Sequence, residues 1–97
     1  MLVQAYGDVE SITPGGYIDH LDSGQVAIFD TMVLYVRSAD GRGPAQLRII
    51  LDGAGRDRWR PGLRIRFDID EQYLTAPGPL FEGTLQNVQP QGTTGPS

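Results

Sequence analysis

The arginines are the side chains whose type and spacing most clearly indicate a binding chemistry. All eight basic residues of this 97-residue chain are Arg, and all lie between Arg37 and Arg66. Only three acids lie in this window, which gives it a net charge of +5, whereas the whole chain carries −4. Such segregation indicates a bipolar surface with one basic region. The alternative is that the arginines lie on ordinary solvated strand faces.

Aromatic side chains accompany these cations. Binding a single-stranded nucleic acid requires cations for the phosphates and flat rings on which bases stack. Phe29, Tyr35 and Arg37 fall on one face of a predicted strand, and Arg48 points outward from the next. The alternative for Phe29 and Tyr35 is that they cover a second small core. A basic loop follows, with Arg56, Arg58 and Arg60 as candidate phosphate contacts around Trp59, which we expect to cap the end of the fold.

The sequence contains only incomplete sets of residues for a catalytic or metal site. Asp19, His20 and Asp22 form an incomplete ligand set, and hydrated acidic turns are far commoner than metal sites of this kind. Asp68 and Asp70 share a strand face, but no third group completes a mechanism. With one His, no Cys and no phosphate-binding glycine motif, we expect neither an enzyme nor a cofactor.

Alternating hydrophobicity predicts an all-β fold. The strongest signals are residues 26–37, 46–52 and 63–70, with weaker strands at 2–12 and 80–88. Their predicted core positions are Val26, Ile28, Met32, Leu34 and Val36, then Leu47, Ile49 and Leu51, then Leu63, Ile65, Phe67 and Ile69. Turn signals between five strands favour a small five-stranded OB-like barrel. The polar segment 17–24 after Pro14-Gly15-Gly16 predicts a protruding hairpin arm.

We expect one domain over residues 1–88 and a disordered tail over 89–97, a segment rich in Gly, Pro, Gln and Thr. No apolar stretch is long enough to span a bilayer, and the N-terminus lacks the pattern of a secretory signal. The absence of Cys fits a reducing compartment. These features predict a cytoplasmic protein that does not enter a membrane.

One run of motifs resembles the gene V family of filamentous phages, whose members coat the single-stranded phage genome inside the infected bacterium. The run is Leu47-Arg48-Ile49-Ile50-Leu51-Asp52 followed by Trp59-x-Pro61-Gly62-Leu63, and the similarity extends back to Gly24 and Tyr35-Val36. The resemblance implies an OB-like barrel that acts as a symmetric dimer and binds single-stranded DNA during replication. By position, it implies DNA contacts at Phe29, Tyr35 and Arg48, with Tyr17 near a DNA-binding wing.

The sequence also differs from that family. The arm carries Asp19 and Asp22 where the family is usually basic, and Ala27 replaces a stacking Tyr. Thr84 and Gln86 stand where the family can carry Arg. These differences imply weaker binding, a different route for the DNA, or a shift toward the arginines around Trp59.

The connection over residues 72–80 is unusually apolar for an exposed loop. We expect it to form a two-fold dimer interface through Tyr73, Leu74, Pro77 and Leu80. The alternative is that these side chains fold back onto their own barrel. A competing function for the whole chain is a protein-interaction module of a phage or mobile element, which the acidic arm and the negative net charge favour.

Overall fold

The computed structural model describes residues 1–51, 58–75 and 78–93. Its strands are β1 (Leu2–His20), β2 (Val26–Ser38), β3 (Ala45–Leu51), β4 (Leu63–Asp70), β5 (Pro79–Phe81) and β6 (Gln86–Thr93). Two short 3-10 helices, η2 (Glu71–Leu74) and η3 (Glu82–Thr84), connect the last three strands. The all-β, barrel-like prediction is confirmed, with six strands in place of five.

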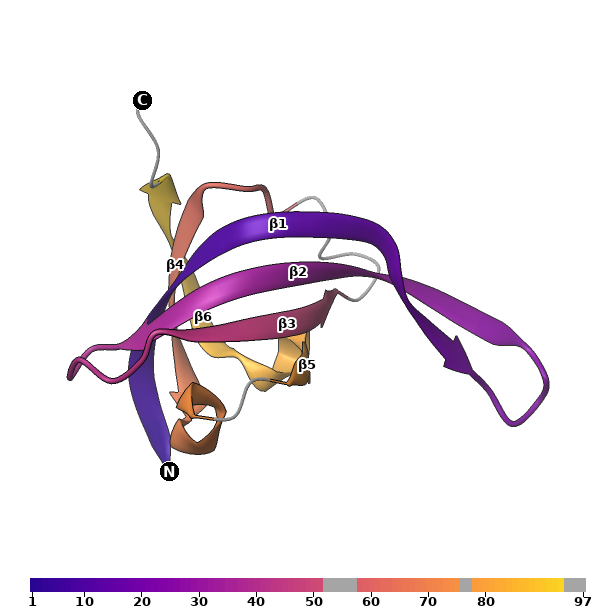
Figure 1. Cartoon of the computed structure of the whole chain (residues 1–97), viewed down its shortest axis with the longest axis horizontal. Coiled ribbons are helices and arrows are strands. Elements are labelled where there is room, and N and C mark those ends of the chain that lie inside the picture. Colours follow the sequence, from indigo (N-terminus) through magenta and orange to yellow (C-terminus); the bar gives the residue numbers. More distant parts are fainter. Residues whose placement is uncertain (52–57, 76–77, 94–97) are drawn as a thin grey trace.

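All six strands form one sheet in the order β5-β3-β2-β1-β4-β6. All neighbours are antiparallel except β3 and β5, which are parallel. Figure 1 shows the sheet curling around its concave face into a half-barrel, while the far ends of β1 and β2 continue outward as a hairpin. We call this hairpin, residues 17–29, the arm; its prediction is confirmed.

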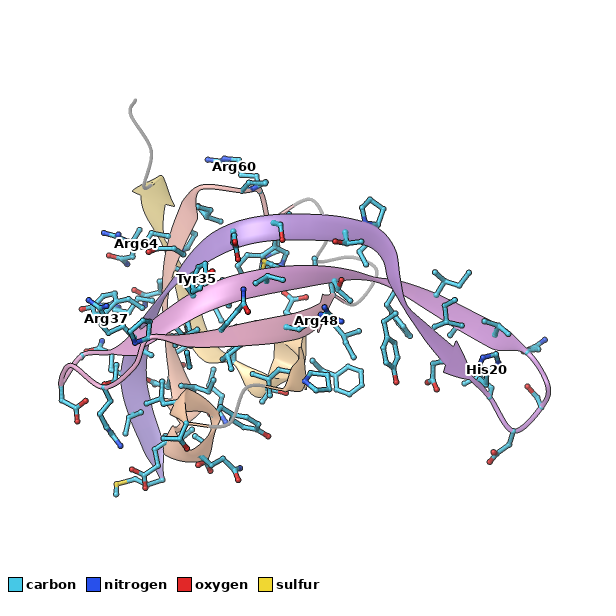
Figure 2. The ribbon with its side chains drawn as sticks, in the orientation of Figure 1. His20, Tyr35, Arg37, Arg48, Arg60 and Arg64 are labelled. Carbon is cyan, nitrogen blue, oxygen red and sulfur yellow. The ribbon has the colours of Figure 1, made fainter. Side chains whose placement is uncertain are left out.

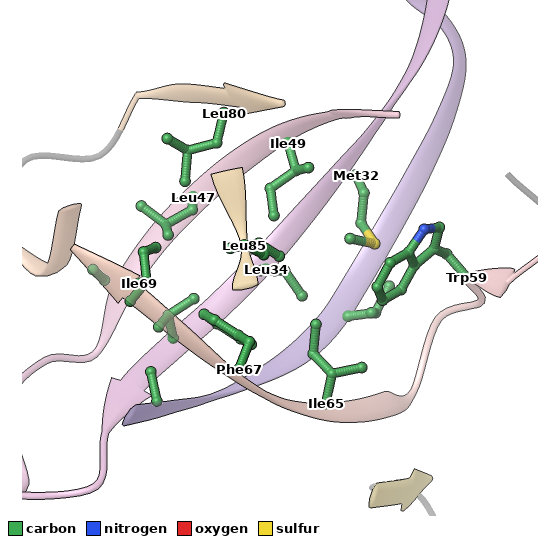
Figure 3. Packing of buried hydrophobic residues seen from close by; sticks show 14 of the residues in the cluster. Met32, Leu34, Leu47, Ile49, Trp59, Ile65, Phe67, Ile69, Leu80 and Leu85 are labelled. Atoms are coloured by element: carbon green, nitrogen blue, oxygen red, sulfur yellow. The ribbon is translucent and has the colours of Figure 1, made fainter. Parts of the chain in front are cut away.

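The concave face holds the hydrophobic core (Figure 3). In β4 the alternation is complete: Leu63, Ile65, Phe67 and Ile69 are buried, while the arginines and aspartates between them point away. Leu47, Ile49 and Leu51 of β3 and Met32, Leu34 and Val36 of β2 are buried as predicted. Ile50, which was expected to point outward, is nevertheless buried, because β5 pairs beside it at Phe81.

β1 does not end at Pro14-Gly15-Gly16, as the turn residues suggested. Thr13 pairs with Thr31 and Tyr17 pairs with Phe29, so three residues of β1 lie opposite Asp30 alone. The Gly15 N–H donates to the Asp30 carboxylate at 3.0 Å, which satisfies a donor in this bulge. A bulge accommodates extra residues and bends the strand pair without ending it.

The core stripe predicted for β2 extends past the core. Val26 and Ile28 have the same alternation as Met32, yet they are 49% and 65% exposed, because this part of β2 lies in the arm. Their prediction as core residues was wrong. The β-period pattern identified the strand and the face correctly, but it could not show where the core ends.

The C-terminal region also differs from its prediction. The expected strand 80–88 is divided into β5, η3 and the start of β6. Residues 89–93, expected to be disordered, continue β6 and pair with β4 from Arg66↔Gln89 to Leu63↔Thr93. Backbone pairing to an open sheet edge requires no apolar side chains, which is why composition did not reveal this strand. Residues 94–97 lie outside the described residues. No helix among the described residues is long and apolar enough to cross a membrane.

The β4–β6 pairing predicts the effect of truncation. Deleting residues 89–97 should lower the free energy of unfolding by about 1–3 kcal/mol, because each lost backbone hydrogen bond contributes roughly 0.5–1.5 kcal/mol. Urea unfolding followed by circular dichroism measures this loss. Deleting only residues 94–97 is the control, since it retains every β4–β6 pair. Equal stability of the full chain and the longer truncation would contradict this role of β6.

Candidate nucleic-acid interface

The convex face of the sheet collects the polar and aromatic side chains that alternate with the core. Directly paired residues share a face, so Arg66, Tyr6 and Arg37 form one row across β4, β1 and β2. A second row crosses four strands through Arg64, Asp8, Tyr35 and Gln46. Arg48 follows on β3, opposite Val33. We call these eight side chains the outer strip: Tyr6, Asp8, Tyr35, Arg37, Gln46, Arg48, Arg64 and Arg66.

Part of the strip lines an open hollow of about 840 Å³. Tyr6 and Tyr35 line it together with Arg37 and Arg64, and Gln91 reaches it from β6. Tyr6 is 39% and Tyr35 44% exposed, so both rings can meet a ligand. In Figure 2, Arg64 of β4 lies near Tyr35 and Arg37 of β2, across the intervening strand β1. The hollow therefore combines exposed rings with cations.

A second hollow of about 490 Å³ lies nearer the arm. Tyr17, Val33, Gln46 and Arg48 contribute to its lining. Gln46 joins the two hollows, because its side-chain amide donates to the Tyr35 hydroxyl at 3.4 Å. Phe29 lies across from Tyr17 at the base of the arm, with 6.2 Å between the ring centroids. The predicted residues Tyr17, Phe29, Tyr35, Arg37 and Arg48 therefore follow one side of the sheet.

The loop after β2 forms one wall of the larger hollow, and hydrogen bonds hold it in place. Ser38 Oγ donates to Asp40 and accepts from the Arg42 N–H at 2.8 Å. The hydrogen bond from Ser38, and then that from Arg42, lower the pKa of Asp40. Hydrogen bonds to Asp40 and to Glu71 raise the pKa of Arg42.

Gly43 is required at the end of this loop. Its φ is +98°, and a Cβ there would lie 2.8 Å from the Val36 carbonyl oxygen. Both the backbone conformation and the lack of space exclude larger residues. The wall of the hollow is therefore fixed by local geometry as well as by the charges on the loop.

Acidic neighbours neutralise part of the strip. Arg64 Nε lies 2.7 Å from Asp8, and this hydrogen bond and charge raise the pKa of Arg64. Glu10 accepts a hydrogen bond from Gln46 at 3.2 Å. Arg66 donates to the Gln89 side chain, which leaves its charge uncompensated. Within the described part of the chain, no ion pair involves Arg37, Arg48 or Arg66.

The two loop arginines that the structure describes, Arg58 and Arg60, do not join the strip. Arg58 pairs with Glu82 at 2.7 Å and lies over Trp59, 5.2 Å from the ring centroid. Arg60 is exposed in the loop before β4, apart from Tyr35 and Arg37 (Figure 2). Trp59 is only 6% exposed and lies at the edge of the core beside Met32 and Ile65 (Figure 3), which confirms its capping role. Arg56 lies outside the described residues.

Sequence reasoning missed Tyr6, Arg64 and Arg66 as members of this surface. The alternation of β4 had placed both arginines outward, but their neighbours on β1 were unknown. Tyr6 lies on a strand whose apolar pattern is weak. Strand order supplied the missing information, because β1 lies between β4 and β2 and brings Tyr6 between two arginines.

The predicted dimer residues are placed differently. Leu74 and Leu80 are 4% and 2% exposed in the single chain and belong to its core. Tyr73 also packs against that core. The burial of Leu74 and Leu80 leaves them little area for a second copy and agrees with the alternative that the connection folds onto its own sheet. Pro77 lies outside the described residues.

No group of three potential metal-ligating side chains, drawn from His, Cys, Asp and Glu, gathers within the described ranges. The described interface therefore consists of rings, guanidinium groups and hydrogen-bonding side chains. Comparison with protein-family models, curated proteins and solved structures found no match to this chain.

Proposed function

We propose that this protein binds single-stranded DNA through the outer strip, without sequence preference and without catalysis. The observation that carries the proposal is the larger hollow, which Tyr6 and Tyr35 line together with Arg37 and Arg64. Exposed rings allow bases to stack, and guanidinium groups bind phosphates. An OB-like architecture and a role in coating a phage genome belong to the same proposal and rest on the motif resemblance.

The strip has a shape suited to an extended strand. From Arg64 on β4 to Arg48 on β3 it crosses three gaps between neighbouring strands, or about 14 Å at roughly 4.8 Å each. The two hollows adjoin along this path through the Tyr35–Gln46 contact. A single strand crossing the sheet in this direction meets Arg64 and Arg48 at the two ends, with Tyr35 and Asp8 between them.

The uneven charge of the chain agrees with this route. The excess of acids lies outside the window Arg37–Arg66, so the net charge of −4 does not describe the strip itself. The strip carries four arginines and one acid, Asp8. A local excess of cations is what phosphate binding requires, because counterions released from the nucleic acid provide much of the affinity.

The first test is a titration of fluorescent oligo-dT at several salt concentrations. Affinity should fall as salt rises, with a log–log slope of roughly −2 to −3 if three or four arginines bind phosphates. Arg37→Gln should weaken binding and reduce the slope by about 0.7. Arg58→Gln should have a smaller effect, because Arg58 already pairs with Glu82. Absence of binding even at low ionic strength would refute the proposal and favour a protein-interaction module.

Stacking is tested by Tyr35→Ala. Loss of this ring should cost about 1–3 kcal/mol of oligo-dT binding, the usual contribution of one stacked base. The melting temperature of the Tyr35→Ala variant should change little, since the Tyr35 side chain is 44% exposed. Leu2→Ala is the control, because Leu2 is an exposed apolar side chain of β1 opposite Asp70. Equal affinity of the Tyr35 variant and the wild type would remove Tyr35 from the interface.

Asp8 should oppose binding by holding Arg64 and by repelling phosphates. Asp8→Asn should therefore tighten oligo-dT binding roughly two- to five-fold, the range that corresponds to one exposed charge interaction. Asp22→Asn makes the same change at the tip of the arm and should alter the affinity less. Binding measured by fluorescence anisotropy at low salt compares the two. Weaker binding by the Asp8 variant would mean that the Asp8–Arg64 pair organises the site.

A further inference from the structure

The arm has two chemically different faces. Ile18 pairs with Ile28 and His20 pairs with Val26, so these side chains share one face. Ile18, Ile28 and Val26 are 54%, 65% and 49% exposed, and Leu21 at the turn is 42% exposed. We call Ile18, Val26 and Ile28 the arm patch; Leu21 follows His20 directly and lies opposite Gln25, so the alternation turns it toward the other face. The opposite face carries Tyr17, Asp19, Ala27 and Phe29.

The patch has the pattern of a core without a covering layer. It continues the stripe that is buried at Met32, Leu34 and Val36. The β1–β4 pairing ends at Asp8 and the β2–β3 pairing ends at Asp30, so neither neighbour accompanies the arm. A two-stranded hairpin is only marginally stable by itself in water. An apolar face on such a ribbon therefore indicates a partner.

We propose that the partner is the arm of a second copy of this chain. Ile18, Val26 and Ile28 are uncharged, and His20 is the one polar side chain paired among them, so this face offers little for a highly charged partner to recognise. Nucleic acid and anionic membranes are disfavoured, because residues 1–36 contain acids but no Lys or Arg. An identical patch is apolar over the same area, and a two-fold axis makes such a surface its own complement.

Charge selects between the two ways of stacking the arms. Parallel arms would bring the two Asp22 side chains together at the tips, whereas antiparallel arms place them at opposite ends of the contact. We therefore assign the antiparallel arrangement. Its two-fold axis lies in the plane of contact and runs perpendicular to the strands. It places Ile28 of one copy against Ile28 of the other. The outer strip lies on the opposite side of the sheet, which Tyr17 and Phe29 share, so the proposed nucleic-acid surface stays accessible.

The size of the patch indicates how strong this contact is. Three partly exposed aliphatic side chains offer at most about a few hundred Å² per copy, less than the roughly 800 Å² per partner of a stable complex. The free protein should therefore be in monomer–dimer exchange that depends on concentration. Because Leu74 and Leu80 are buried, the arm also replaces residues 72–80 as the place where two copies meet.

Sedimentation velocity of the full chain without DNA, from micromolar to millimolar concentration, tests self-association independently of the proposed function. The weight-average sedimentation coefficient should rise with concentration. In methyl NMR spectra, signals of Ile18 and Ile28 should shift or broaden over the same range, whereas Ile65 of the core should not. A sedimentation coefficient that shows no association at any concentration overturns the proposal.

A charge exchange at Ile28 tests the arrangement. Ile28→Glu and Ile28→Arg should each be monomeric, because the antiparallel contact opposes two like charges. Their equimolar mixture should restore a dimer in which Glu faces Arg. Phe81→Glu is the control, since Phe81 is 57% exposed on β5 and should leave association unchanged. Circular dichroism confirms that each variant is folded. Dimers of either Ile28 variant alone, or no dimer in the mixture, contradict the antiparallel contact.

Discussion

The long pairing of β1 with β2 is the interaction on which the rest of the structure depends. It extends from Ala5↔Ser38 to His20↔Val26, so a single ladder belongs to the core, the outer strip and the arm. Within the half-barrel this pair is flanked by β4 and β3, whose apolar faces complete the core. In the arm, neither β3 nor β4 flanks the β1–β2 pair. The apolar side chains that alternate along β2 are therefore exposed there, whereas those in the half-barrel are buried. The bulge at residues 14–16 marks this change of environment without interrupting the ladder.

One sheet curled around one core has a second consequence. Every strand has an inner face that must be apolar and an outer face that water can solvate. Positions on the outer face can therefore carry arginine or tyrosine with little loss of folding stability. Cross-strand pairing then brings these side chains close to one another. The proposed interface is built on paired strands, with one wall formed by the hydrogen-bonded loop that contains Asp40 and Arg42. Such a surface is largely formed before any ligand arrives.

Electrostatics adjust this surface more than they hold the fold together. The ion pairs of the described residues are at least partly exposed, and pairs of this kind contribute little to stability. Their effect is to determine which cations are available: Arg58 and Arg64 are engaged by Glu82 and Asp8, whereas Arg37 and Arg48 have no ion-pair partner in the described ranges. The arginine-rich window of 30 residues, Arg37 to Arg66, thus contains both paired arginines and arginines that remain available to a ligand.

The sequence by itself determined the fold class, the inward and outward faces of β3 and β4, the arm and the capping Trp59, because period-two alternation and turn chemistry are local properties. It placed Tyr35, Arg37 and Arg48 on solvent faces for the same reason. Tertiary structure decided what those faces contain. Tyr6, Arg64 and Arg66 joined the strip through strand order, and residues 89–93 became a strand because an open edge of β4 was available. Burial of Leu74 and Leu80, and exposure of Ile28, likewise depended on where the core ends. Apolar residues alternate in the same way inside and outside the core. Only the packing of strands that are distant in the sequence determines where the core ends.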